Sequence, residues 1–128
     1  MKLLLDTHLL LWAAAMPEKL SPEARALITH SANDLIFSAA SLWEVAIKAG
    51  LGRADFDIDP TLLRKGLVEN GYNELVITAS HGIATSNLAS VHKDPFDRIL
   101  IAQAVTEGIE LLTSDPVVAR YEGPIRLV

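Results

Sequence analysis

Four acidic residues stand where the apolar pattern of the chain predicts that strands end or helices begin: Asp6, Glu44, Asp97 and Asp115. In an open parallel sheet, ligands bind beyond the carboxyl ends of the strands, and the N-termini of the crossover helices lie along the same edge. We therefore expect the four carboxylates to converge. Several anions in one partly buried pocket repel one another unless cations bind among them. The pattern predicts a divalent-metal site.

The nature of the ligands indicates which metal and which chemistry to expect. All four are oxygen donors and the chain has no cysteine, which favours Mg²⁺, with Mn²⁺ as a substitute, over zinc. Two such ions, about 3.5 to 4 Å apart, suit phosphodiester hydrolysis, because one helps water form hydroxide and both offset charge on the attacking and leaving oxygens. We therefore predict a metal-dependent nuclease in which the four acids are both metal ligands and catalytic residues.

Each acid also has a local explanation as a helix cap. Asp6 and Asp115 stand at N-cap positions, and Ser41-x-x-Glu44 and Asp94-x-x-Asp97 have the form of capping boxes. Caps alone would leave a catalytically silent protein-binding module as the alternative function. Asp97 argues against that alternative, because it heads a helical apolar stripe that should place it on a buried face. The stripe continues through Leu100, Ile101, Ala104 and Val105.

The elements that must position these acids follow from the hydrophobic pattern. Short apolar runs predict buried strands at residues 3–5, 35–37, 75–77, 109–113 and 125–128. Helical periodicity predicts helices at residues 8–15, 22–31, 41–50, 60–70, 79–89 and 95–107, with Ser21-Pro22 as a helix start. Alternating strands and helices predict an α/β fold with a mostly parallel sheet and helices on both faces.

Composition limits the remaining possibilities. A chain of 128 residues, 50% hydrophobic, suits a single domain spanning residues 1–128. A net charge of −5 excludes a protein that holds nucleic acid by a broad basic surface. The longest apolar run, residues 9–16, is too short to cross a bilayer, and Asp6 and His8 interrupt any signal peptide. We expect a cytoplasmic protein without membrane association.

Four segments together resemble a known family. They are Leu3-Leu4-Leu5-Asp6-Thr7-His8, the stretch from Ser38 to Lys48 with its Trp43-Glu44 pair, the stretch from His92 to Ala104, and Leu112-Thr113-Ser114-Asp115. In order and spacing, from Met1 to about Tyr121, they resemble the PIN-domain family, and most closely the stand-alone bacterial toxins of VapC type. Residues 52–75 match none of its motifs.

The resemblance implies a three-layer α/β/α sandwich with a five-stranded parallel sheet. It also implies Mg²⁺-dependent endoribonuclease activity as the toxin of a toxin-antitoxin pair, homodimerisation, and inhibition by a small cognate antitoxin protein. By matching positions, Asp6, Glu44 and Asp97 are the main metal-binding acids, and Asp115 is the fourth, more variable one. The high apolar content independently hints at a buried interface. An antitoxin could inhibit by placing a basic side chain in the acidic pocket.

Neighbours of the acids are secondary candidates. In related PIN proteins, hydroxyls at positions such as Thr7 and Ser41 help to orient an acid or a water, although caps would look the same. Asp94 could join the outer part of the pocket, or simply cap the helix ahead of Pro95. Lys48 follows Glu44 by four residues, the spacing of an ordinary helical ion pair.

A small positive cluster, Lys93 and Arg98 with His92, could contact the RNA backbone, unless these residues form a solvated helix start. We assign no catalytic role to any of the four histidines. Trp12 and Trp43 should lie in the core or at an interface, since no strand carries the aromatic ladder of a base-stacking platform.

Two other enzyme classes fit less well. A receiver-type phosphoacceptor needs an acid after its third strand, but the third run here ends at Thr78. A phosphatase of the Asp-x-Asp type needs a second acid two residues after Asp6, where this chain has His8.

Overall fold

The computed structural model describes all residues, 1–128, and contains one five-stranded sheet flanked by helices. The strands are β1 (Lys2–Leu5), β2 (Asp34–Ser38), β3 (Asn73–Leu75), β4 (Glu110–Thr113) and β5 (Ile125–Leu127). Their order is β3-β2-β1-β4-β5, and all four neighbouring pairs are parallel. The helices are α1 (Thr7–Ala15), α2 (Pro22–Thr29), α3 (Ala39–Gly50), α4 (Pro60–Glu69), α5 (Ala79–Ala84) and α6 (Pro95–Glu107).

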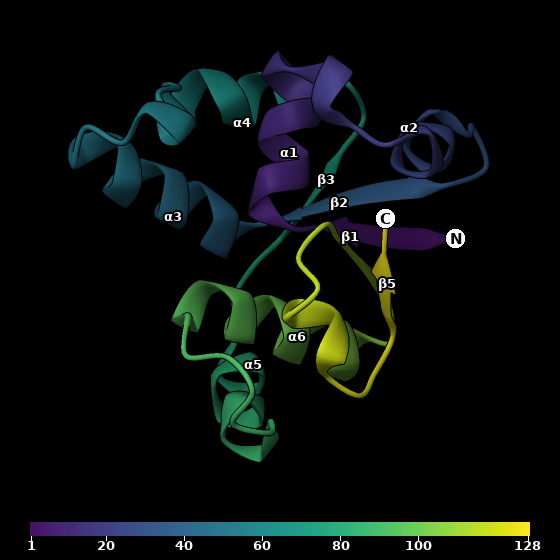
Figure 1. Cartoon of the computed structure of the whole chain (residues 1–128), viewed down its shortest axis with the longest axis vertical. Helices are drawn as coiled ribbons and strands as arrows, with labels where there is room; N and C mark the ends of the chain where they lie inside the picture. The colour runs from purple at the N-terminus through teal and green to yellow at the C-terminus, as the bar shows by residue number, and fades with distance from the viewer.

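The helices form two layers, one on each side of the sheet. Figure 1 shows α1, α2 and α4 on one side of the sheet and α5 and α6 on the other, with α3 beside α1 and α4. The predicted α/β/α sandwich is therefore confirmed. No helix has both the length and the apolar content that crossing a membrane requires.

The position of β1 in the centre of the sheet explains why its sequence is apolar at consecutive positions. Leu3 and Leu5 belong to the core beneath α1, α2 and α4, while Leu4 belongs to the core beneath α6, and all three are fully buried. Strand side chains alternate between the two faces, so a strand covered on both sides must be apolar throughout. β1 lies between β2 and β4, and its carboxyl end delivers Asp6 to the middle of the sheet edge.

Most element boundaries agree with the predicted ones to within two residues, and the largest differences are in the third strand and the fifth helix. The third strand lies at Asn73–Leu75 rather than 75–77, because its pairing with β2 ends where β2 itself ends, at Ser38 opposite Leu75. Val76 and Ile77 are consequently exposed. The fifth helix ends at Ala84 rather than near residue 89, and continues only as a short 3-10 turn at Thr85–Asn87.

The start of α3 also differs. Ser38, not Ser41, caps the helix, with its hydroxyl accepting from the backbone N–H of Ala40 at 3.0 Å. The expected Ser41–Glu44 capping box is therefore wrong, and Glu44 lies in the second turn of α3 rather than the first. Its carboxylate is free for another role.

Helix α6 begins and ends as predicted, at Pro95 and Glu107. Asp94 caps it by accepting from the backbone N–H of Phe96 at 2.9 Å, whereas Asp97 does not complete the expected capping box. Of the predicted apolar stripe, Leu100, Ile101 and Ala104 are buried. Val105 is exposed, so the stripe is one residue narrower than the sequence indicated.

Candidate metal centre

The candidate site is a pocket at the edge of the sheet where β1 and β4 end and where the first turns of α6 begin. Its volume is about 260 Å³, and no hydrophobic residue lines it. All four predicted acids line this pocket. The lining residues are Asp6, Thr7, His8, Glu44, Lys48, His92, Asp94, Asp97, Ser114 and Asp115.

Asp6 both caps a helix and lines the pocket, so its two sequence interpretations are compatible. Its Oδ1 accepts from the backbone N–H of Leu9 at 2.9 Å, which caps α1. Its Oδ2 accepts from the Thr113 hydroxyl at 2.6 Å, which ties β1 to the end of β4. Burial raises the pKa of the Asp6 carboxyl, and the Thr113 hydrogen bond partly opposes that rise. The carboxylate is thus held in one orientation.

Glu44 is almost completely buried, at 3% exposed, and only one of its oxygens has a partner. The Lys48 ammonium pairs with Oε2, which confirms the predicted i,i+4 ion pair. Oε1 is buried and has no hydrogen-bond partner. A buried carboxylate oxygen without a donor is costly, so a cation bound at this oxygen would stabilise the site.

Asp97 is a second carboxyl of the pocket whose pKa is raised. Burial, together with the nearby carboxylates of Asp94, Glu44 and Asp6, raises the pKa of Asp97 to about 7, against the lowering effect of His92. These effects require the acids to lie within electrostatic range of one another, as the sequence predicted. The pocket contains more negative charge than its own cations offset.

His92 was predicted only as part of the positive cluster with Lys93 and Arg98, but its ring lines the acid pocket. Its Nε2 lies 2.8 Å from Oδ2 of Asp97 and 3.9 Å from Oδ2 of Asp115. The loop before α6 places the ring there, because the backbone N–H of His92 donates to the Tyr121 hydroxyl at 2.8 Å. The available signal was local: His92 stands two residues before Asp94 and five before Asp97.

The tightest group of potential metal donors differs from the predicted set. One donor atom from each of His92, Asp94 and Asp97 lies within 4.8 Å of the others. Only Asp97 belongs to both sets. Asp94 is thus a cap and a pocket residue at once. Two overlapping donor groups share Asp97 and occupy the same pocket.

The predicted supporting hydroxyls contact each other. The Thr7 hydroxyl donates to Oγ of Ser41 at 3.0 Å, and both side chains are buried. Thr7 lines the pocket and Ser41 does not. The bond joins the first turn of α1, the helix that Asp6 caps, to the first turn of α3, the helix that carries Glu44.

The predicted RNA contacts lie outside the pocket lining. Lys93 is exposed. The Arg98 guanidinium donates to the backbone carbonyls of Thr85, Ala89 and His92 and to the Tyr121 hydroxyl, at 2.9 to 3.3 Å. The structure therefore gives Arg98 the role of holding the loop that positions His92, a role that the sequence did not indicate.

Substituting Arg98 by Met should destabilise the protein, because three backbone carbonyls and a hydroxyl lose a charged donor at once. We expect the free energy of unfolding to fall by about 2–3 kcal/mol, measurable by urea denaturation. Lys93→Met, which removes the same charge from an exposed neighbour, should change it by less than about 0.5 kcal/mol. Equal effects of the two substitutions would show that Arg98 does not hold the loop.

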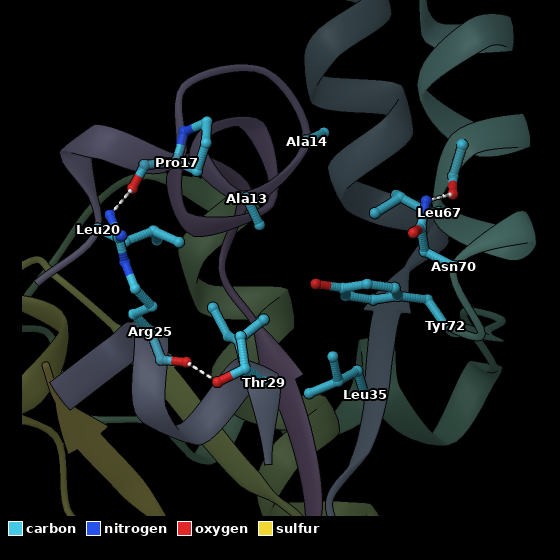
Figure 2. Close-up of a pocket in the computed structure, with 12 residues that line it drawn as sticks. Ala13, Ala14, Pro17, Leu20, Arg25, Thr29, Leu35, Leu67, Asn70 and Tyr72 are labelled. Atoms are coloured by element: carbon cyan, nitrogen blue, oxygen red, sulfur yellow. Dashed lines mark hydrogen bonds between the residues drawn. The ribbon is translucent and has the colours of Figure 1, made fainter. Parts of the chain in front are cut away.

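A larger cavity lies elsewhere, between α1, α2 and α4, and has a different character. Its volume is about 600 Å³, and seven of its twelve lining residues are hydrophobic. In Figure 2 the Tyr72 ring lies between Leu67 and Leu35, while Arg25 lies on the opposite wall. The Arg25 guanidinium already donates to the Pro17 carbonyl at 2.7 Å. The cavity has no carboxylate, so it is not a second metal site.

Comparison with known proteins agrees with this geometry. The family model of the PIN domain matches residues 3–124. The chain belongs to the PIN-domain family. Ribonuclease VapC22 of Mycobacterium tuberculosis is 31% identical to it over 112 residues, which cover 88% of this chain and 85% of that protein. The likeness to VapC-type toxins noted in the sequence is thereby confirmed.

The PIN fold is also found in a solved structure. A chain in the crystal structure of VapBC2 from Rickettsia felis, bound to a DNA fragment from their promoter, superposes with a TM-score of 0.71 at 13% identity. The match covers 99% of this chain and 98% of that chain. The complete sandwich is therefore shared, including the segment 52–75 for which the sequence showed no motif.

Proposed function

We propose that this PIN domain is a Mg²⁺- or Mn²⁺-dependent endoribonuclease. The observation that carries the proposal is the charge imbalance of the pocket: Oε1 of Glu44 is buried without a partner, and the neighbouring carboxylates help to raise the pKa of Asp97 to about 7. Both features are expected where a divalent cation completes a site. Similarity to a protein named as a ribonuclease supports RNA as the substrate.

Asp6, Glu44, Asp97 and Asp115 would hold the metal, with His92 and Asp94 next to them. A divalent ion in this pocket supplies Lewis acidity, which makes water a better nucleophile and offsets negative charge on the phosphate. The residues around the acids fix their directions. Lys48 holds one oxygen of Glu44 and leaves the other free, while Thr113 and the N-terminus of α1 hold Asp6.

The proposed cellular role is that of a toxin whose activity a cognate antitoxin protein restrains. The relationship to VapC22 and the shared fold with VapBC2 support this role. The pocket is lined by five carboxylates and has no hydrophobic residue, which suits inhibition by a basic side chain of the antitoxin that would occupy the place of the cation. We also propose that the protein forms a homodimer.

The test of the proposed function is a cleavage assay on total RNA with the purified full chain. We expect fragments to accumulate with millimolar Mg²⁺ or Mn²⁺ and to disappear when EDTA is added. The products should carry a 5′-phosphate and a 3′-hydroxyl, because water attacks the phosphorus and the 3′-oxygen leaves. Cleavage that persists in EDTA, or products that end in a cyclic phosphate, would contradict the proposal. No cleavage and no metal binding would favour a silent binding module.

A further inference from the structure

The largest exposed aromatic ring of the molecule lies next to the acid pocket. Trp43 is 60% exposed, so it is not the core residue that its helical position allowed. The indole and the Phe96 ring pack in a T-shaped arrangement, with centroids 5.3 Å apart and an interplanar angle of 77°. The contact joins α3 to α6 and supports the indole, while most of the Trp43 side chain remains open to solvent.

Three links connect this aromatic pair to the pocket. Trp43 directly precedes Glu44, and Phe96 directly precedes Asp97. Lys48 lines the pocket, pairs with Glu44, and has its ammonium 5.9 Å from the centre of the Phe96 ring. Lys48 is therefore near both the Phe96 ring and the carboxylate of Glu44.

An RNA strand that enters this pocket needs binding energy that charge does not provide. The chain has a net charge of −5, and Arg98 is engaged with the protein backbone. Apart from histidines, Lys48 is the sole cation in the pocket lining. Stacking of bases on aromatic side chains binds single strands without requiring a basic surface and without sequence preference.

We propose that Trp43, supported by Phe96, is a stacking surface for a nucleobase of the RNA strand whose phosphate reaches the acid pocket, a proposal that rests on the proposed ribonuclease function. Lys48 then lies between the stacked base and the acids, where it can face a backbone phosphate. A single ring can hold one base and leave its neighbours free to enter the pocket.

A protein partner would contact more of α3 than a nucleobase would. Ile47 and Leu51 follow Trp43 at intervals of four residues and are also exposed, so they extend an apolar stripe along α3. A packed helix would need the whole stripe, whereas a nucleobase needs only the indole beside Phe96. Leu51→Ala is therefore the matched control, since it removes exposed apolar surface from the stripe at the end away from the pocket.

The test uses the full chain carrying Trp12→Phe, so that Trp43 is the only tryptophan, and Asp97→Asn, so that RNA is not cut. Binding of a short single-stranded RNA should quench the Trp43 fluorescence, and an RNA with an abasic site at the stacked position should quench it less. Trp43→Leu should weaken RNA binding by about 5- to 100-fold, and Trp43→Phe should restore part of it. With Asp97 intact, Trp43→Leu should raise KM with little change in kcat.

The proposal is overturned if RNA binds without quenching, or if Trp43→Leu and Leu51→Ala have equal effects on RNA binding. A change of oligomeric state with both variants, and unchanged KM, would assign the stripe to a protein interface instead. Failure of the nuclease function is a separate result, namely that the protein with native Trp43 and Asp97 does not cut RNA in Mn²⁺.

Discussion

Replacing Asp97 by Asn is expected to abolish RNA cleavage while making the metal-free protein more stable. The loss of a metal ligand should cost more than the roughly 10- to 100-fold that even outer partners of ligands cost. The gain in stability follows from burial and from the three nearby acids, which together raise the pKa of Asp97 to about 7. A neutral amide of the same shape removes this unfavourable charge. We therefore expect the free energy of unfolding at pH 8 to increase by about 1–2 kcal/mol.

Asp57→Asn is the matched control for this experiment, because it changes the net charge equally at an exposed position outside the pocket. It should leave both cleavage and stability unchanged. Urea denaturation in EDTA and a cleavage assay in Mn²⁺ give the two readouts. A variant of Asp97 that is inactive but no more stable than the unsubstituted protein would show that the acids do not repel one another as described.

The second large expected effect is that stabilisation of the folded protein by Mn²⁺ depends on pH. A carboxyl whose pKa is raised in the folded state binds a proton there that the unfolded chain has already released. Between about pH 4 and 7, the free energy of unfolding of the metal-free protein should therefore fall as pH rises. Metal binding requires the ionised carboxylate, so stabilisation by Mn²⁺ should grow over the same interval.

At pH 8, Mn²⁺ at about 100 times its Kd should increase the free energy of unfolding by about 2.7 kcal/mol. For a domain of this size, that corresponds to a rise in Tm of roughly 10 °C. At pH 5.5 the shift in Tm should be much smaller. Differential scanning calorimetry at the two pH values, with and without Mn²⁺, measures both. The Asp97→Asn variant should lose most of the pH dependence. An equal shift in Tm at pH 5.5 and pH 8 would contradict the assignment of Asp97 to the metal site.

Patterns that involve many residues allowed the fold to be predicted from the sequence. The apolar runs that become β1 and β4 are buried on both faces, and α6 begins at an unambiguous Asp94-Pro95 signal. Convergence of the acids followed from topology alone, because a parallel sheet brings the ends of β1 and β4 to one edge.

The predictions that were wrong concern element boundaries, where two neighbouring positions are almost equally suitable in sequence. Two serines, Ser38 and Ser41, could cap α3, and the one at the end of β2 does so because strand pairing fixes where the helix can begin. The position of β3 was misplaced because an edge strand pairs only as far as its single neighbour allows.

Contacts between segments that are far apart in the sequence also could not be predicted. His92 reaches Asp97 because Tyr121, from the far end of the chain, and Arg98 hold the loop that contains it. No spacing in the sequence reports such a contact. For the same reason the exposure of Trp43 beside the pocket could be seen only in the structure.

The central claim is that the carboxylates at the carboxyl edge of the sheet bind a divalent cation. Anomalous diffraction from crystals of the full chain soaked in Mn²⁺ tests it most directly. We expect a peak inside the acid pocket, within coordination distance of an Asp97 oxygen and of Oε1 of Glu44, the buried oxygen that has no partner. Peaks only outside this pocket, or none at millimolar Mn²⁺ and pH 8, would contradict it.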